Sequence, residues 1–133
     1  MSYQELSGTD DLSYTVPTKI NENFRKRAFL NASSVSADFT VWSNDAAGTP
    51  RDIYLVTTAA STITATLPSA GSSDALAGRV VTIFKVDAGA GSVTIDGNGS
   101  ETINGATTVS LASQYDYRTL ISDGTQWLVI GQN

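Results

Sequence analysis

The chain has 133 residues and a mass of 14.0 kDa, the size of one ordinary domain. Thr, Ser and Gly make up 44 of the 133 residues and charged residues only 16%, which favours turn-rich β structure over a helical bundle. The absence of Cys and His excludes thiolate nucleophiles, imidazole bases, disulfides and Cys/His zinc sites. The net charge of −5 argues against a nucleic-acid partner, because binding to phosphates needs a basic surface.

The first 30 residues differ in character from the rest. Residues 1–16 are rich in turn formers and lack periodicity, which predicts an extended arm. Residues 17–30 begin with a proline and carry apolar residues four apart, which predicts one short helix. Because so short a helix is marginal alone, we expect it to dock on the β domain, on a sister chain or on a larger assembly. The apolar residues expected to make that contact are Val16, Ile20, Phe24 and Leu30.

The chain carries no pattern typical of a membrane protein. Its start lacks the basic end and apolar run of a secretory signal. No stretch approaches the roughly 20 apolar residues that a membrane-spanning helix needs. We therefore expect no membrane insertion.

From residue 31 onward, the pattern predicts an all-β body over residues 31–133. Short segments of period two are separated by Gly, Pro, Asn or Asp turns. We expect about eight antiparallel strands in a β-sandwich or jelly-roll-like domain, each sheet having one buried and one water-facing side. The predicted strands are residues 39–42, 52–58, 62–67, 79–87, 92–96, 107–112, 116–122 and 126–130.

Two local signals refine this expectation. The segment Ser122–Thr125 (S-D-G-T) predicts a closing hairpin, because Asp-Gly suits a turn whose two central residues adopt positive φ. The segment 94–97 (T-I-D-G) is echoed at 102–105 (T-I-N-G). A repeat architecture needs three or more units, so we interpret the two copies as consecutive turn-bounded edges of one sheet.

Carboxylates are the acidic groups left for acid–base or metal chemistry. The segment 96–101 superficially resembles a calcium loop, but its sixth position is Glu101 where Gly is needed, and the twelfth is Thr107 where Glu is needed. A glycosidase would need two carboxylates facing one cleft. The candidates lie beside Gly or at strand ends, where Asp usually serves turns, so we expect no enzyme activity, no metal and no cofactor. They are Asp87, Asp96, Glu101, Asp116 and Asp123.

The aromatic residues could have two roles, packing in the core or binding a ligand. Strand aromatics in small β domains mostly pack in the core, and we expect this for most of them. The alternative is a platform on which a sugar ring stacks, since amphipathic rings combine an apolar face with a polar handle. Its residues would be Tyr115, Tyr117 and Trp127.

An ordered series of short motifs runs from Thr62 to Gly131. It comprises a Thr-rich strand ending in Leu67-Pro68, a Gly78-Arg79 start to an I-x-K-x-D strand, then V-T-I, E-T-I-x-G and a closing S-D-G-T-x-W hairpin. In this order the motifs, which cover about half of the chain, resemble a module common in tailed-bacteriophage fibre and virion-surface proteins. The segment Thr18–Phe24 (T-K-I-N-E-N-F) is similar to one that often opens phage fibre and structural subunits.

The resemblance implies a homotrimeric, non-enzymatic structural protein at the virion surface. It implies that residues 1–30 attach to the major capsid protein or to a tail or baseplate protein. Because only about 30 residues precede the body, a long fibre shaft is not expected. A capsid decoration (cement) protein, a short head fibre or a tail adaptor is favoured. The alternative is a tail-fibre tip or adaptor that recognises a bacterial surface glycan.

Overall fold

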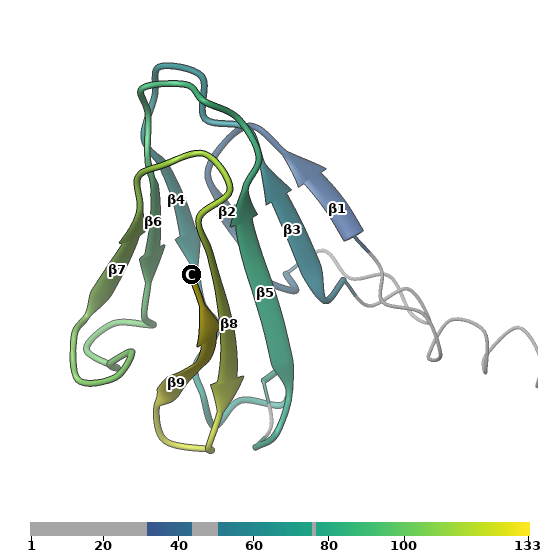
Figure 1. Cartoon of the computed structure of the whole chain (residues 1–133). Coiled ribbons are helices and arrows are strands. Elements are labelled where there is room, and N and C mark those ends of the chain that lie inside the picture. Colours follow the sequence, from purple (N-terminus) through teal and green to yellow (C-terminus); the bar gives the residue numbers. More distant parts are fainter. Residues whose placement is uncertain (1–31, 44–50, 76) are drawn as a thin grey trace, which may run out of the picture. The chain divides into compact units, whose positions relative to one another are not determined.

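The computed structural model describes residues 32–43, 51–75 and 77–133. These residues form an all-β, sandwich-like fold of nine strands in two mixed sheets (Figure 1). The described ranges contain no helix long and apolar enough to cross a membrane. The arm and helix predicted for residues 1–30 lie outside the described residues. The same holds for the predicted attachment residues Val16, Ile20, Phe24 and Leu30.

All eight predicted strands are present, together with one that was not predicted. One sheet has the order β1-β3-β5-β8-β9, and its strands are Ala32–Val35, Ile53–Val56, Val80–Lys85, Tyr117–Ser122 and Trp127–Gln132. The other has the order β2-β4-β6-β7, and its strands are Phe39–Thr40, Ile63–Thr66, Val93–Asp96 and Thr108–Leu111. The unpredicted strand is β1, whose sequence A-S-S-V has little β propensity of its own.

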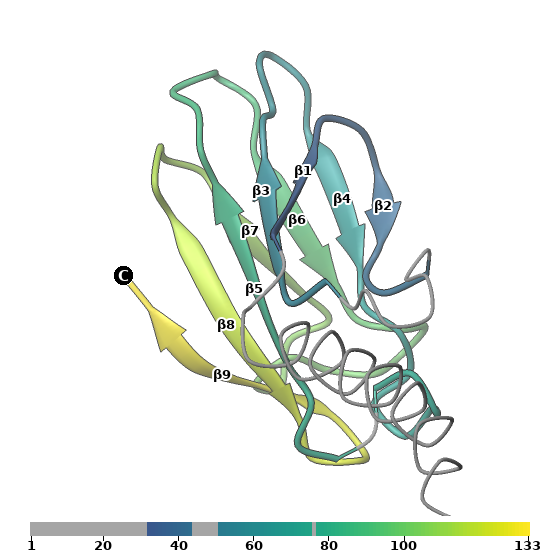
Figure 2. The same cartoon turned by 90° about the vertical axis from the view of Figure 1, so that its right-hand side faces the viewer.

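The first six strands alternate between the two sheets (Figure 2). Because each connection crosses to the facing sheet and the next one returns, neighbours within a sheet run in the same direction. Four strand pairs are therefore parallel, and only the three pairs that involve β7, β8 or β9 are antiparallel. The prediction of an antiparallel, jelly-roll-like domain is wrong in this respect.

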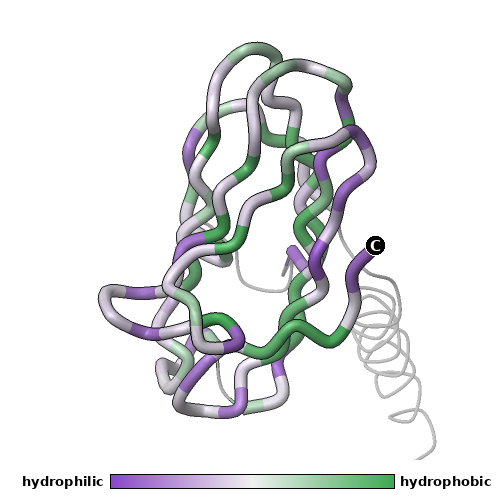
Figure 3. Tube along the Cα trace, turned by 60° about the vertical axis from the view of Figure 1, so that its left-hand side comes forward, coloured by the Kyte–Doolittle hydropathy of each residue, from purple (hydrophilic) through white to green (hydrophobic). Residues whose placement is uncertain are grey.

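The hydrophobic core lies between the sheets. Inward positions recur at every second residue, as in the burial of Val81, Ile83 and Lys85 along β5. Figure 3 shows hydrophobic positions recurring along the strands. The largest fully buried side chains are Trp127, Lys85, Leu67, Ile83, Ile95, Ile103, Leu111, Leu120, Val41, Val56, Val81 and Val93.

The second copy of the T-I-x-G echo does not form a sheet edge. Ile103 is completely buried and makes isolated bridges to Ala106 and Trp127. Asn104 and Gly105 adopt positive φ, 50° and 88°, and turn the chain back at once. The interpretation as consecutive edges is wrong, because only the first copy lies in a strand, β6, whereas the second is a tight turn that buries Ile103 in the core.

The closing hairpin is confirmed by the antiparallel pairing of β8 with β9. The Asp123 N–H donates to the Gln126 carbonyl at 3.1 Å, and only Gly124, with φ of 95°, has positive φ. The Asp123 carboxylate accepts bonds from the backbone N–H of Thr125 at 2.8 Å and of Gln126 at 2.9 Å. These bonds build a longer turn than the predicted two-residue form, in which Asp123 would also have positive φ.

Candidate functional site

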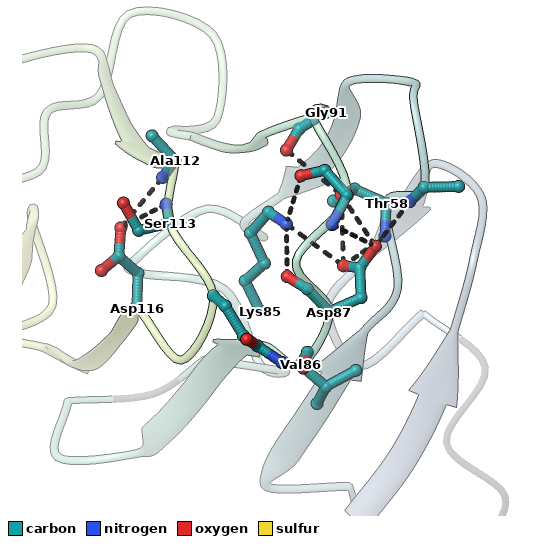
Figure 4. Close-up of polar contacts among 11 residues, drawn as sticks. Thr58, Lys85, Val86, Asp87, Gly91, Ala112, Ser113 and Asp116 are labelled. Atoms are coloured by element: carbon teal, nitrogen blue, oxygen red, sulfur yellow. Dashed lines mark hydrogen bonds and ion pairs between the residues drawn. The ribbon is translucent and has the colours of Figure 1, made fainter.

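A buried lysine closes one end of the sandwich. Lys85 ends β5 with its side chain inward, and its Nζ donates to the carbonyls of Asp87 at 2.7 Å and Gly89 at 3.0 Å and to Asp87 Oδ1 at 3.2 Å (Figure 4). Asp87 also accepts bonds from the N–H groups of Thr58 at 3.0 Å and Ala59 at 2.8 Å. The Thr58 N–H bond, with those from Ala59 and Lys85, holds the pKa of Asp87 well below its usual range despite the opposing effect of burial.

This network ties the turn after β3 to the turn after β5. The Thr58 hydroxyl donates to the Gly91 carbonyl at 3.1 Å. A Cβ at Gly91 would lie 2.0 Å from the Ser61 carbonyl oxygen, so only glycine permits the two turns to approach this closely. The Lys85 network is therefore a structural lock between successive windings of the chain.

A second set of bonds holds the opposite end of the strands. The Glu101 carboxylate accepts the hydroxyl of Ser69 at 2.6 Å and the N–H of Ala70 at 2.9 Å. Trp127 Nε1 donates to the Pro68 carbonyl at 3.1 Å. The loop that follows β4 is thus fixed by residues from two segments distant in sequence.

The predicted acidic candidates serve turns in four of five cases. Asp116 accepts the backbone N–H groups of Ala112 at 3.0 Å and Ser113 at 2.8 Å, in the same way as Asp87, Glu101 and Asp123 accept theirs. Asp96 instead belongs to the outward row of β6. Within the described ranges, no three acidic side chains gather as a metal site. The turn role that the sequence favoured is confirmed for Asp87, Glu101, Asp116 and Asp123.

Trp127 cannot serve the glycan-stacking role that the sequence left open. Its side chain is 0% exposed, and its ring lies 5.8 Å, centroid to centroid, from that of the buried Trp42. A sugar needs an exposed ring face on which to stack, and Trp127 has none. The structure therefore removes Trp127 from the predicted set.

Tyr115 and Tyr117 do come together, with Phe84 between them. The Phe84 ring centroid lies 6.1 Å from that of Tyr115 and 6.3 Å from that of Tyr117. Tyr115 is 58% exposed and adopts φ of 71°, a left-handed conformation that is strained for a residue with a side chain. The Asn133 side chain donates to the Tyr115 carbonyl at 3.3 Å and accepts the Tyr117 N–H at 3.1 Å.

This aromatic cluster continues into the outer face that β3, β5, β8 and β9 form on the five-stranded sheet, here termed the apolar face. Cross-strand rows place Leu55 beside Phe84 and Phe84 beside Tyr117. All members of the face are half-buried, and the outward positions of the described strands of this sheet hold no charged residue. The apolar face consists of Ile53, Leu55, Val80, Thr82, Phe84, Tyr117, Thr119, Ile121 and Leu128.

The outer face of the four-stranded sheet has the opposite character and is termed the hydroxyl face. Its rows pair Thr64 with Thr94 and Ser110, and Thr66 with Asp96. This sheet confirms the predicted alternation of buried and water-facing residues. The hydroxyl face consists of Thr40, Thr64, Thr66, Thr94, Asp96, Thr108 and Ser110.

The apolar face was missed by reasoning from the sequence. The signal was present, since β3 reads I-Y-L-V and β9 begins W-L-V-I. Such continuous apolar runs are typical of strands that are covered on both sides, whereas alternation is typical of strands with one wet side.

The sequence matches no protein-family model, and no curated protein is similar to it. What the chain binds therefore has to be inferred from its own residues. The apolar face and the Tyr115 cluster at its end are the surface features on which such an inference rests.

Proposed function

We propose that the chain is a non-enzymatic structural protein of a tailed-phage virion. It is a trimeric accessory knob on the particle surface, as a capsid decoration (cement) protein or short fibre. Residues 1–30 attach it to the major capsid protein or to a tail or baseplate protein. The β body, residues 31–133, forms the knob.

The observation that carries the proposal is the order of phage-like motifs from Thr62 to Gly131. Several of these motif residues bond to each other in the fold. Lys85 and Asp87 of I-x-K-x-D form the buried lock, and the tryptophan of the closing motif bonds to the carbonyl of Pro68. A likeness at mutually bonded residues supports a common framework better than a likeness confined to turns.

The proposed mechanism is apolar burial multiplied by repetition. Each copy would bury a few apolar side chains of its helix against the particle, a small contribution per site at about 25 cal/mol per Å². Copies joined in one knob would convert later contacts into intramolecular ones and raise the overall avidity. Many weak contacts would then clamp neighbouring shell subunits together.

The direct test is to search for the chain in virions purified from a lysate of the strain that carries its gene. We expect mass spectrometry to detect it, and gold-labelled antibody to mark the particle surface. Its absence from purified virions would overturn the proposed function.

Deletion of residues 1–16 tests the attachment. We expect the shortened chain to lose binding to particles while the circular dichroism of the β body is unchanged. Thr94→Lys, which changes the hydroxyl face of the body, is the control and should bind as the wild type does. Unchanged binding of the shortened chain would contradict the role of the arm.

The alternative function is recognition of a bacterial surface glycan, as a tail-fibre tip or adaptor. The observation that favours it is the exposure of Tyr115 beside Phe84 and Tyr117, held in a strained conformation. On a glycan array, binding that Tyr115→Ala removes and Thr125→Ala retains would support it. Both residues are exposed, so both variants are expected to fold.

A further inference from the structure

We infer that the apolar face is the surface through which copies of this chain associate. The inference deepens the proposed function, on which it rests for the number of copies, by assigning the contact to one side of one sheet. The occupant of the face is thus a second copy of the same chain.

The size of the apolar face suits a weak contact. Its four strands, β3 with four residues and β5, β8 and β9 with six each, lie about 4.8 Å apart and rise about 3.3 Å per residue, so they span roughly 350 Å². Two such faces in contact bury roughly 700 Å², the size of a weak or transient interface. Exposed apolar patches of a few hundred Å² commonly mark interaction sites.

The charge distribution favours a second copy over a different partner. The chain has a net charge of −5, yet the outward positions of its five-stranded sheet that the structure describes are uncharged. Around a shared symmetry axis the same face of every copy is brought together, so charges of one sign on the face would repel each other. A basic partner would instead be drawn to the acidic residues, which lie elsewhere on the chain.

Two of the four edge strands, β9 and β2, are poorly suited to pairing between copies by edge addition. The pairing of β8 with the edge strand β9 shifts register between Thr119 and Leu120, and such an irregularity twists an edge away from further pairing. On the other sheet, the edge strand β2 has two residues. Association through the face is therefore the arrangement that leaves these edges unused.

Light scattering coupled to size exclusion tests the inference on the full-length chain. We expect the wild type to have a mass that is a multiple of 14.0 kDa, threefold if the proposed function is right. Leu55→Lys and Ile121→Lys place a charge on the apolar face, and each should lower the mass to 14.0 kDa. Thr64→Lys and Thr94→Lys place the same charge on the hydroxyl face and should leave the mass unchanged. Circular dichroism checks that every variant is folded.

Two outcomes would overturn the inference. One is a wild-type chain of 14.0 kDa at every concentration, and the other is an oligomer that Leu55→Lys and Ile121→Lys, both folded, leave intact. Because the chain has no cysteine, Leu128→Cys gives a second readout that does not disturb charge. Oxidation should cross-link Leu128→Cys between chains, and Thr94→Cys should remain uncross-linked.

The two proposals fail in different ways. A monomer that is nevertheless found in virions would overturn the inference and leave the proposed function standing. An oligomer that only the apolar-face variants dissociate, in a chain absent from virions, would support the inference and overturn the proposed function.

Discussion

The two outer faces of the sandwich are built from the same period-two backbone but present opposite chemistry. The hydroxyl face pairs threonines such as Thr64 and Thr94 across strands, whereas the apolar face sets Leu55 beside Phe84 and Phe84 beside Tyr117. The strands beneath differ accordingly, since β4 reads I-T-A-T and β3 reads I-Y-L-V. A strand with one water-facing side usually alternates apolar and polar residues. The strands of the apolar face lack this alternation, so this is the face that we expect a partner to cover.

Strand β5 shows that this contrast does not follow the usual division of apolar inside and charged outside. Phe84 faces outward on the apolar face, whereas the adjacent Lys85 faces inward and is completely buried. The three bonds of the Lys85 Nζ to Asp87 and Gly89 make this exchange tolerable, because a buried ammonium is costly unless it is paired.

The largest expected effect is the difference in stability between a substitution in the core, at Trp127, and one at the exposed end of the apolar face, at Tyr115. Trp127→Ala should lower the free energy of unfolding by about 3–5 kcal/mol, because a fully buried aromatic ring is lost. Tyr115→Gly should change it by less than about 1 kcal/mol, because removal of an exposed ring is offset by relief of the strained φ. Urea denaturation of both variants measures the difference. Equal losses of stability in the two variants would contradict the expectation that the exposed Tyr115 ring contributes little to the fold.

A second expected effect compares the stability contributed by the two faces. A partner present at 100 times its Kd stabilises a protein by about 2.7 kcal/mol, so the wild-type Tm should rise with protein concentration. Ile121→Thr should abolish that dependence by removing apolar area from the apolar face. Thr94→Val, on the hydroxyl face, should retain it. A wild-type Tm independent of concentration would show that the apolar face contributes nothing through association.

The exchange along β5 predicts a smaller effect. Lys85→Met should lower the free energy of unfolding by roughly 1–3 kcal/mol, because the partly buried carbonyls of Asp87 and Gly89 lose their donor while the volume is kept. Arg118→Met is the control, since Arg118 is only half-buried and its Nη1 bonds to the neighbouring Tyr117 carbonyl. Urea denaturation distinguishes them, and equal stability of Lys85→Met and the wild type would contradict the lock.

Strand positions could be predicted from the sequence, but their directions could not. Turn residues and β propensity locate the ends of β2 to β9 to within two residues, and β1 was missed because its A-S-S-V acquires strand structure by pairing with β3. The sequence of a single strand does not show whether its neighbour runs parallel to it. No sequence repeat shows it here either, because the segments between paired residues differ in length: Ala32 pairs with Ile53, and Ile53 pairs with the more distant Thr82.

The side chains that matter for a site were harder to predict than the strands. Trp127 and Tyr115 are both aromatic residues near strand starts, yet one is 0% and the other 58% exposed. The burial of Lys85 depends on acceptors supplied by the following turn, which no periodicity encodes. The turn roles of Asp87 and Asp123 were predicted because a carboxylate at a strand end or beside glycine serves a local backbone need.

The smallest expected effect concerns pH and the turn that joins β8 to β9. Backbone bonds from Gln126 and Thr125, with the Thr125 hydroxyl, lower the pKa of Asp123 from 3.8 to about 2. A depressed folded-state pKa stabilises the fold above the unfolded pKa, and this stabilisation is lost as the pH falls through about 2. The wild type should therefore exceed Asp123→Asn in Tm near neutral pH, and the gap should narrow between pH 4 and about 2. The pKa of Asp87 is lowered in both proteins, so the difference between them isolates Asp123. A gap that stays constant down to pH 2 would mean that the turn depends on the shape of the Asp123 side chain and not on its charge.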